Sequence, residues 1–99
     1  MRTPRGDLEQ ELQDPEYARL YGAASAKSEF AVALARARKE LDLLRTELGE
    51  KVGREGYLGA RYIKRLESGE ANPRVGDIGS LFAAMGLRLV IGTAPLKGE

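Results

Sequence analysis

Apolar residues recur at helical spacing through the middle of the chain. The series runs from Phe30 to Val52, with members at Leu34, Ala37, Leu41, Leu44 and Leu48. Spacings of three and four residues are typical of one face of an α-helix, so the pattern allows a continuous helix from about Ser25 to Val52. Such a helix would be about 42 Å long, whereas a domain of this size has a radius of gyration of about 13 Å. We therefore expect a break between Leu41 and Leu44, although neither glycine nor proline lies there.

Two helix-start signals precede this series. Asp7 can cap a short helix over 8–13, after an N-terminal arm formed by residues 1–6. Asp14-Pro15-Glu16 is the second signal, because aspartate caps, proline suits the first helical position and glutamate faces the positive end of the helix dipole. We expect this second helix to end near Gly22.

Glycines punctuate the second half of the chain. Residues 53–59 contain three glycines, and each costs about 1 kcal/mol in a helix interior, so we interpret this stretch as a loop. Apolar stripes predict two further helices, around residues 62–66 and 78–85. Gly69 and Gly86 follow them, and glycine favours the left-handed conformation that ends a helix.

These elements predict an all-α protein with a short β-strand near its end. The strand is expected over residues 87–91, Leu-Arg-Leu-Val-Ile, which are bounded by glycine and proline. We expect five or six short helices before it. A bundle of short helices joined by tight turns is typical of a helix-turn-helix domain.

Composition disfavours several classes of function. The chain has neither cysteine nor histidine, so we expect no disulfide, no metal site and no histidine general base. Its glycines do not match a phosphate-binding loop. No apolar run approaches the ~20 residues of a membrane span, and the first residues lead into acidic sequence rather than an apolar signal core. We therefore expect a cytoplasmic protein that is not an enzyme and binds no cofactor.

The net charge of +1 conceals an uneven distribution. Residues 51–75 carry six basic and three acidic side chains, whereas residues 1–24 carry three basic and five acidic side chains. A local excess of positive charge fits a surface that binds phosphate groups. The alternative is an ordinary solvated helix face, which charge alone favours.

The segment from Ile63 to Pro73, Ile-Lys-Arg-Leu-Glu-Ser-Gly-Glu-Ala-Asn-Pro, closely resembles the end of the recognition helix in the lambda-repressor-like (Xre) helix-turn-helix family. Residues 38–53 resemble the end of that family's first helix, its turn and its second helix, and residues 77–86 resemble its closing helix. Residues 12–30 resemble the leader of the HigA-like antitoxins of that family. The resemblance implies a leader over 1–24, a helix-turn-helix DNA-binding domain over 25–86, and a strand and tail over 87–99.

The chain departs from the family pattern in three places. Asp42 stands where the family usually has glycine, and Leu44-Arg45 stands where it usually has Thr-Gln. Between Gly53 and Ile63 the chain has about four residues more than usual, an insertion that a turn accepts at little cost. Because the insertion lies in the turn or at the start of the recognition helix, it puts the DNA-reading geometry in question.

The resemblance also implies which residues contact DNA, since the second helix of the motif enters the major groove. The matching positions and their basic neighbours are Arg45, Arg54, Ala60, Arg61, Lys64 and Arg74. Arg61 is expected to bind guanine, because a guanidinium can make two hydrogen bonds to that base. Tyr57 and Tyr62 either stack on DNA or pack on the edge of the bundle, and we favour packing.

Two further expectations follow from the resemblance. An ion pair is expected between Arg38, near the end of the first motif helix, and Glu67, after the recognition helix. The antitoxin subgroup implies a RelE/HigB-like ribonuclease toxin as partner, whose basic surface the acidic leader would cover. The leader residues that would anchor this contact are Leu8, Leu12, Tyr17, Leu20 and Tyr21. The alternative is that these residues pack on the chain's own bundle.

We therefore predict a DNA-binding antitoxin that represses its own toxin–antitoxin operon. We expect a homodimer on double-stranded DNA, formed by pairing of the strand over 87–91 with that of a second copy. One alternative is a stand-alone helix-turn-helix transcriptional regulator. Another is a protein-interaction module in which the insertion has abolished DNA binding.

Overall fold

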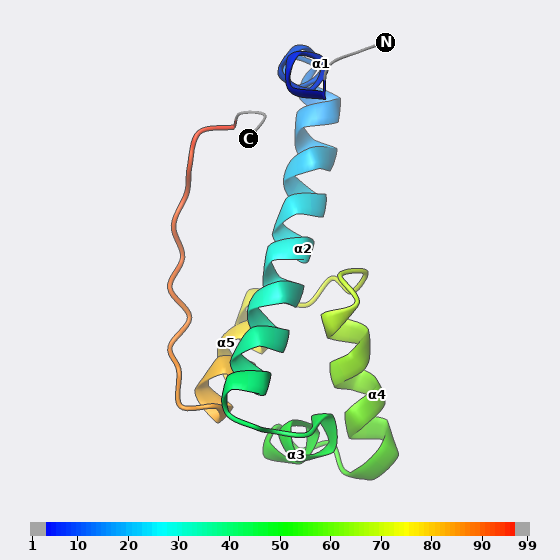
Figure 1. Ribbon diagram of the computed structural model, residues 1–99, viewed down its shortest axis with the longest axis vertical. Helices are drawn as coiled ribbons and strands as arrows, with labels where there is room; N and C mark the ends of the chain where they lie inside the picture. The colour runs from blue at the N-terminus through cyan, green and yellow to red at the C-terminus, as the bar shows by residue number, and fades with distance from the viewer. Residues whose placement is uncertain (1–3, 97–99) are drawn as a thin grey trace. The chain divides into compact units, whose positions relative to one another are not determined.

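The computed structural model describes residues 4–96, and this part of the chain contains five α-helices (Figure 1). They are α1 (Pro4–Glu11), α2 (Pro15–Glu40), α3 (Arg45–Lys51), α4 (Gly56–Glu67) and α5 (Val75–Ala84). Residues Lys27–Val90 form one compact unit, which we call the bundle, and the remaining described residues form another. The prediction of a helical protein is confirmed.

The core of the bundle takes one fully buried side chain from each of its four helices. These side chains are Leu34 of α2, Leu48 of α3, Ile63 of α4 and Leu81 of α5. Burial of each such side chain contributes about 1.5–3 kcal/mol. Phe30 and Phe82 add an edge-to-face contact, with ring centroids 6.4 Å apart. The expected stripes of the last two helices therefore face this core.

The predicted break in the long apolar pattern is confirmed, since α2 ends at Glu40 and α3 begins at Arg45. Asp42 lies in the turn with a φ of 55°, in the left-handed region that favours glycine. The backbone N–H of Leu44 then donates to Oε1 of Glu47 at 2.7 Å, which satisfies an amide at the start of α3. A side-chain cap and one left-handed residue thus replace the glycine or proline that the pattern lacks.

The N-terminal helix boundaries were predicted in part. α2 begins at Pro15, and the amide of Glu16 donates to Oδ1 of Asp14 at 3.0 Å, as the start signal indicated. The predicted end near Gly22 is wrong, because α2 continues to Glu40. One glycine costs only about 1 kcal/mol, and helix-favouring alanines follow it. The first helix begins at Pro4 rather than after Asp7, and residues 1–3 of the expected arm lie outside the described residues.

The loop predicted over 53–59 is shorter than expected, because α4 already begins at Gly56. Gly59 is buried inside this helix, where it faces Gly49 of α3. A Cβ on Gly49 would lie 2.7 Å from the Cα of Gly59, and a Cβ on Gly59 would collide with the carbonyl oxygen of Arg54. These glycines therefore allow two helices to approach closely and do not interrupt α4.

The strand predicted over 87–91 is wrong, because the described residues contain no strand and residues 87–96 are neither helical nor extended in a sheet. The amide of Leu87 bonds to the carbonyl of Phe82 at 2.8 Å, and Leu89 packs against the core. Val90 and Ile91 are exposed. A strand needs a neighbour to pair its backbone, and the described part of the chain supplies none.

Candidate nucleic-acid interface

One side of α4 holds the helix in the bundle, and the opposite side is open to solvent. Gly59, Ile63 and Leu66 are buried. Tyr57, Ala60, Arg61 and Lys64 follow the spacing i, i+3, i+4 and i+7, which places them along one line of the helix surface. We call these four residues the α4 face. They line a surface depression together with Arg45, Arg65, Ser68 and Glu70.

The depression is strongly basic. Its lining includes four cationic side chains, Arg45, Arg61, Lys64 and Arg65, and one carboxylate, that of Glu70. A cluster of arginine and lysine side chains attracts the phosphates of nucleic acid, and binding releases the counterions that had been condensed on the nucleic acid. Three of the six basic residues noticed in the sequence between residues 51 and 75 line this depression, namely Arg61, Lys64 and Arg65.

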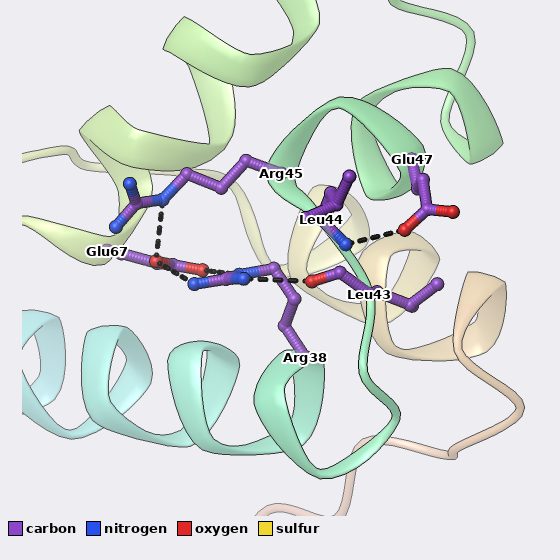
Figure 2. Close-up of polar contacts among 6 residues, drawn as sticks. All are labelled: Arg38, Leu43, Leu44, Arg45, Glu47 and Glu67. Atoms are coloured by element: carbon purple, nitrogen blue, oxygen red, sulfur yellow. Dashed lines mark hydrogen bonds and ion pairs between the residues drawn. The ribbon is translucent and has the colours of Figure 1, made fainter.

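Glu67, the last residue of α4, joins three helices through its carboxylate (Figure 2). Arg38 of α2 donates from Nε to Oε2 at 2.6 Å and from Nη2 to Oε1 at 3.1 Å. Arg45 of α3 donates from Nε to Oε1 at 3.2 Å. The side chains of Arg38 and Glu67 are only 10% and 5% exposed, so the ion pair expected between them lies inside the bundle.

The arginines also determine the ionisation of this carboxylate. Burial raises the pKa of Glu67, but the hydrogen bonds and charge of Arg38, followed by those of Arg45, outweigh that effect and lower the pKa below its usual value. Glu67 is therefore ionised at neutral pH. Arg38 also donates from Nη1 to the carbonyl of Leu43 at 2.9 Å, which fixes the turn between α2 and α3 (Figure 2).

Arg45 occupies the boundary between the buried ion pair and the depression. Its side chain is 42% exposed and it is the first residue of α3. Because the hydrogen bond to Glu67 uses Nε, it orients the guanidinium without engaging the two terminal nitrogens. This residue can therefore present its outer N–H groups to an anion in a fixed direction.

The predicted contact residues do not all lie together. Arg45, Ala60, Arg61 and Lys64 line the depression. Arg54 lies in the turn before α4 with its guanidinium 3.9 Å from the ring centroid of Tyr62, a cation–π contact. Arg74 is exposed directly before α5. Neither Arg54 nor Arg74 is among the residues that line the depression.

The two tyrosines near the motif differ in their surroundings. Tyr62 is half-buried and packs against the core, as we favoured for both. Tyr57 is 76% exposed and lines the depression, so the expectation of packing is wrong for this residue. Sequence reasoning named Tyr57 but favoured packing, and it placed this residue in a loop because α4 was expected to begin later. The spacing from Tyr57 to Lys64 becomes visible once the helix begins at Gly56.

The leader residues lie outside the core of the bundle. The residues that form this core, or pack against it, extend from Phe30 to Leu89. Leu20 is 64% exposed, and the rings of Tyr17 and Tyr21 stack with centroids 6.5 Å apart. Leu8 and Leu12 are half-buried within the unit that contains α1.

Two further observations concern the described part of the chain. None of its helices combines the length and the apolar character that crossing a membrane requires. No group of three or more aspartate and glutamate side chains in this part is placed to hold a metal ion.

Comparison with known proteins relates these features to a family. Residues 34–91 match a family model described as helix-turn-helix. No curated protein and no solved structure matched the chain. The matched segment begins inside α2 and includes α3, α4 and α5, so it contains the ion pair and the whole α4 face. Because this match covers more than half of the chain, the protein belongs to the helix-turn-helix family.

Proposed function

We propose that the protein is a transcriptional regulator that binds double-stranded DNA by placing α4 in the major groove. The observation that carries this proposal is the α4 face, which presents Arg61 and Lys64 beside a depression lined by two further arginines. In helix-turn-helix proteins the second helix of the motif lies in the major groove, and its N-terminal residues contact base edges. α4 follows α3 after a short turn and occupies that position.

The residues of the α4 face and the neighbouring arginines contact different parts of the DNA in this proposal. Arg61 binds the O6 and N7 atoms of a guanine, and the small side chain of Ala60 lets the helix approach the bases. Lys64 and Arg45 bind phosphate, Arg45 with the orientation that Glu67 gives it. Arg54 and Arg74 contact phosphates at the flanks of the site.

We further propose that the protein acts as a homodimer on two half-sites about one turn of DNA apart. One short basic helix makes few phosphate contacts, and a second copy doubles them. The exposed side chains of Val90 and Ile91 support this proposal, because contact with a second copy would remove their apolar surface from water.

The finer hypothesis is that this regulator is an antitoxin of the HigA-like kind, which represses its own operon in the cytoplasm and neutralises a RelE/HigB-like ribonuclease. Its support is the leader, which is acidic and carries an exposed leucine outside the core of the bundle. Charge attracts an acidic segment to the basic surface of an RNA-binding partner, and the apolar residues then hold it there. A stand-alone regulator would lack such a partner.

Salt-dependent binding to duplex DNA tests the proposal. Fluorescence anisotropy with a labelled duplex of random sequence, measured across a series of salt concentrations, gives the affinity and its salt slope. The R61A/K64A variant should bind more weakly, because Arg61 loses its contact to a base. Its salt slope should be lower by about 2, since each of the two copies in the proposed homodimer loses the phosphate contact of Lys64 and each such contact contributes about 0.9. R36A is the matched control, because Arg36 is an exposed arginine of α2 that does not line the depression. If the wild-type protein binds no duplex even at low salt, the proposal fails and the protein-interaction alternative replaces it.

A further inference from the structure

The first turn of α4 is unusual for a helix that approaches DNA, because it consists of Gly56, Tyr57, Leu58 and Gly59. This turn therefore presents an aromatic ring within the segment between Gly53 and Ile63, where the chain has more residues than the family pattern. Tyr57 is 76% exposed, although a tyrosine typically buries 150–250 Å² in a core or an interface. The fold of the bundle does not explain this residue.

The place of Tyr57 within the α4 face suggests what its ring contacts. Tyr57 lies one turn before Arg61 on the same line of the helix, with Ala60 beside them. Four residues of α-helix advance by about 6 Å, which is close to two base steps at 3.4 Å each along one strand. If Arg61 binds a guanine, the Tyr57 ring lies over the edge of a base pair one or two steps away.

The chemistry of the major groove then selects the base. Thymine is distinguished there by its 5-methyl group, which apolar side chains contact. The Tyr57 ring and the Ala60 methyl group offer an apolar surface at this end of the α4 face, whereas the other end carries the positive charges of Arg61 and Lys64. The apolar end of the α4 face is therefore complementary to a thymine methyl group, and its charged end is complementary to a guanine and to phosphates.

We infer that Tyr57 is a specificity-determining residue that packs its ring on the 5-methyl group of a thymine, one or two base pairs from the guanine bound by Arg61. The inference rests on the proposed function, because it needs α4 to enter the major groove. Tyr62 has no such role, since its ring is half-buried beneath the guanidinium of Arg54.

Replacing thymine with deoxyuridine removes only this methyl group and so tests the inference directly. A preferred duplex is first selected from a random-sequence pool with the full-length wild-type protein. Each thymine of that duplex is then replaced in turn by deoxyuridine, and the affinity is measured by anisotropy. At one position the wild-type protein should lose about fourfold in affinity, the effect expected for one buried methyl-sized group. Y57A should bind the thymine and deoxyuridine duplexes equally.

Two further variants separate the role of the ring from a general effect on α4. Y57F keeps the ring and should keep the preference for thymine. L58A is the matched control, because Leu58 is similarly exposed on the same turn but does not line the depression with the α4 face. It should also keep the preference. Circular dichroism establishes that each variant is folded.

The outcomes distinguish this inference from the proposed function. If the wild-type protein selects no duplex and binds none, the proposed function fails and the inference fails with it. If the protein selects a duplex but no thymine position is sensitive to deoxyuridine, only the inference is overturned. The same holds if Y57A remains as sensitive to deoxyuridine as the wild-type protein.

Discussion

Arg38 and Glu67 are 29 residues apart in sequence, yet the guanidinium of Arg38 makes two hydrogen bonds to the Glu67 carboxylate, at 2.6 and 3.1 Å. Both side chains are almost completely removed from water. An ion in such a place is stable only while its partner is present, because the desolvation of an unpaired charge costs several kcal/mol. The pair therefore makes the junction of α2, α3 and α4 sensitive to a single substitution.

We predict that R38A lowers the free energy of unfolding by about 3–5 kcal/mol, since it leaves the Glu67 carboxylate buried beside only the more exposed Arg45. Urea denaturation of the two proteins measures this difference. R36A, two residues away on the exposed side of α2, should change stability by less than about 0.5 kcal/mol. A loss below 1 kcal/mol for R38A would show that Glu67 is hydrated after the substitution or that Arg45 replaces Arg38.

Acid should weaken the same junction. The pKa of Glu67 is lowered in the folded protein, so its ionised form contributes stability above the unfolded pKa of about 4.3. This contribution is lost as the pH falls through the lower folded pKa. The difference in unfolding free energy between the wild-type protein and E67Q should therefore be largest near neutral pH and shrink below about pH 4. Because both proteins contain all the other carboxylates, subtracting the unfolding free energy of E67Q from that of the wild-type protein removes their effect. A difference that stays constant from pH 7 to pH 3 would contradict the assigned shift.

Packing between helices explains where sequence reasoning failed for the fold. The break after Glu40 and the ends of α4 and α5 were predictable, because they depend on chain length and on local capping. Gly59 lies against Gly49, ten residues earlier, and no local rule reports that contact between helices. The strand over 87–91 was inferred from β-branched and apolar residues, but a strand also needs a partner.

The candidate site was predictable to a similar degree. Arg45, Ala60, Arg61 and Lys64 were found by matching a family motif, and the structure places all four along one depression. Tyr57 was expected to pack on the bundle rather than to face solvent, because the glycines around it indicated a loop. Arg54 is not among the residues that line that depression and contacts the Tyr62 ring, an arrangement that no spacing rule predicts.

The close approach of α3 and α4 at Gly59 leads to a prediction about the stability of a glycine-to-alanine variant. We expect G59A to lower the free energy of unfolding by at least about 2 kcal/mol, because its Cβ would collide with a backbone carbonyl that cannot rotate away. G79A is the matched control, since Gly79 lies in the middle of α5 with no atom within 4 Å of the added Cβ. It should raise stability by about 0.5–1 kcal/mol. Thermal unfolding followed by circular dichroism compares the two, and a stabilising G59A would show that the helices separate freely.

Asp42 allows a test of the backbone conformation in the turn between α2 and α3. Its φ of 55° costs a non-glycine residue about 1–2 kcal/mol, and aspartate tolerates this region better than alanine does. D42G should therefore stabilise the protein, by up to about 1 kcal/mol after the greater entropy of unfolded glycine is included. D42A should destabilise it. Opposite signs for the two substitutions in denaturant unfolding support the left-handed turn, whereas equal effects would place Asp42 in an ordinary conformation.

Removal of the leader tests the antitoxin hypothesis most directly. Removal of residues 1–22 takes away five acidic and three basic side chains but none of the core residues between Phe30 and Leu89. The truncated protein should therefore unfold with nearly the wild-type free energy and bind duplex DNA at least as well, because its net charge rises by two. A ribonuclease partner co-expressed with it should no longer co-purify. In the full-length chain, L20E should weaken partner binding without affecting DNA binding, since Leu20 is exposed. If the truncated protein unfolds, or still retains the partner, the leader is not the toxin-binding element.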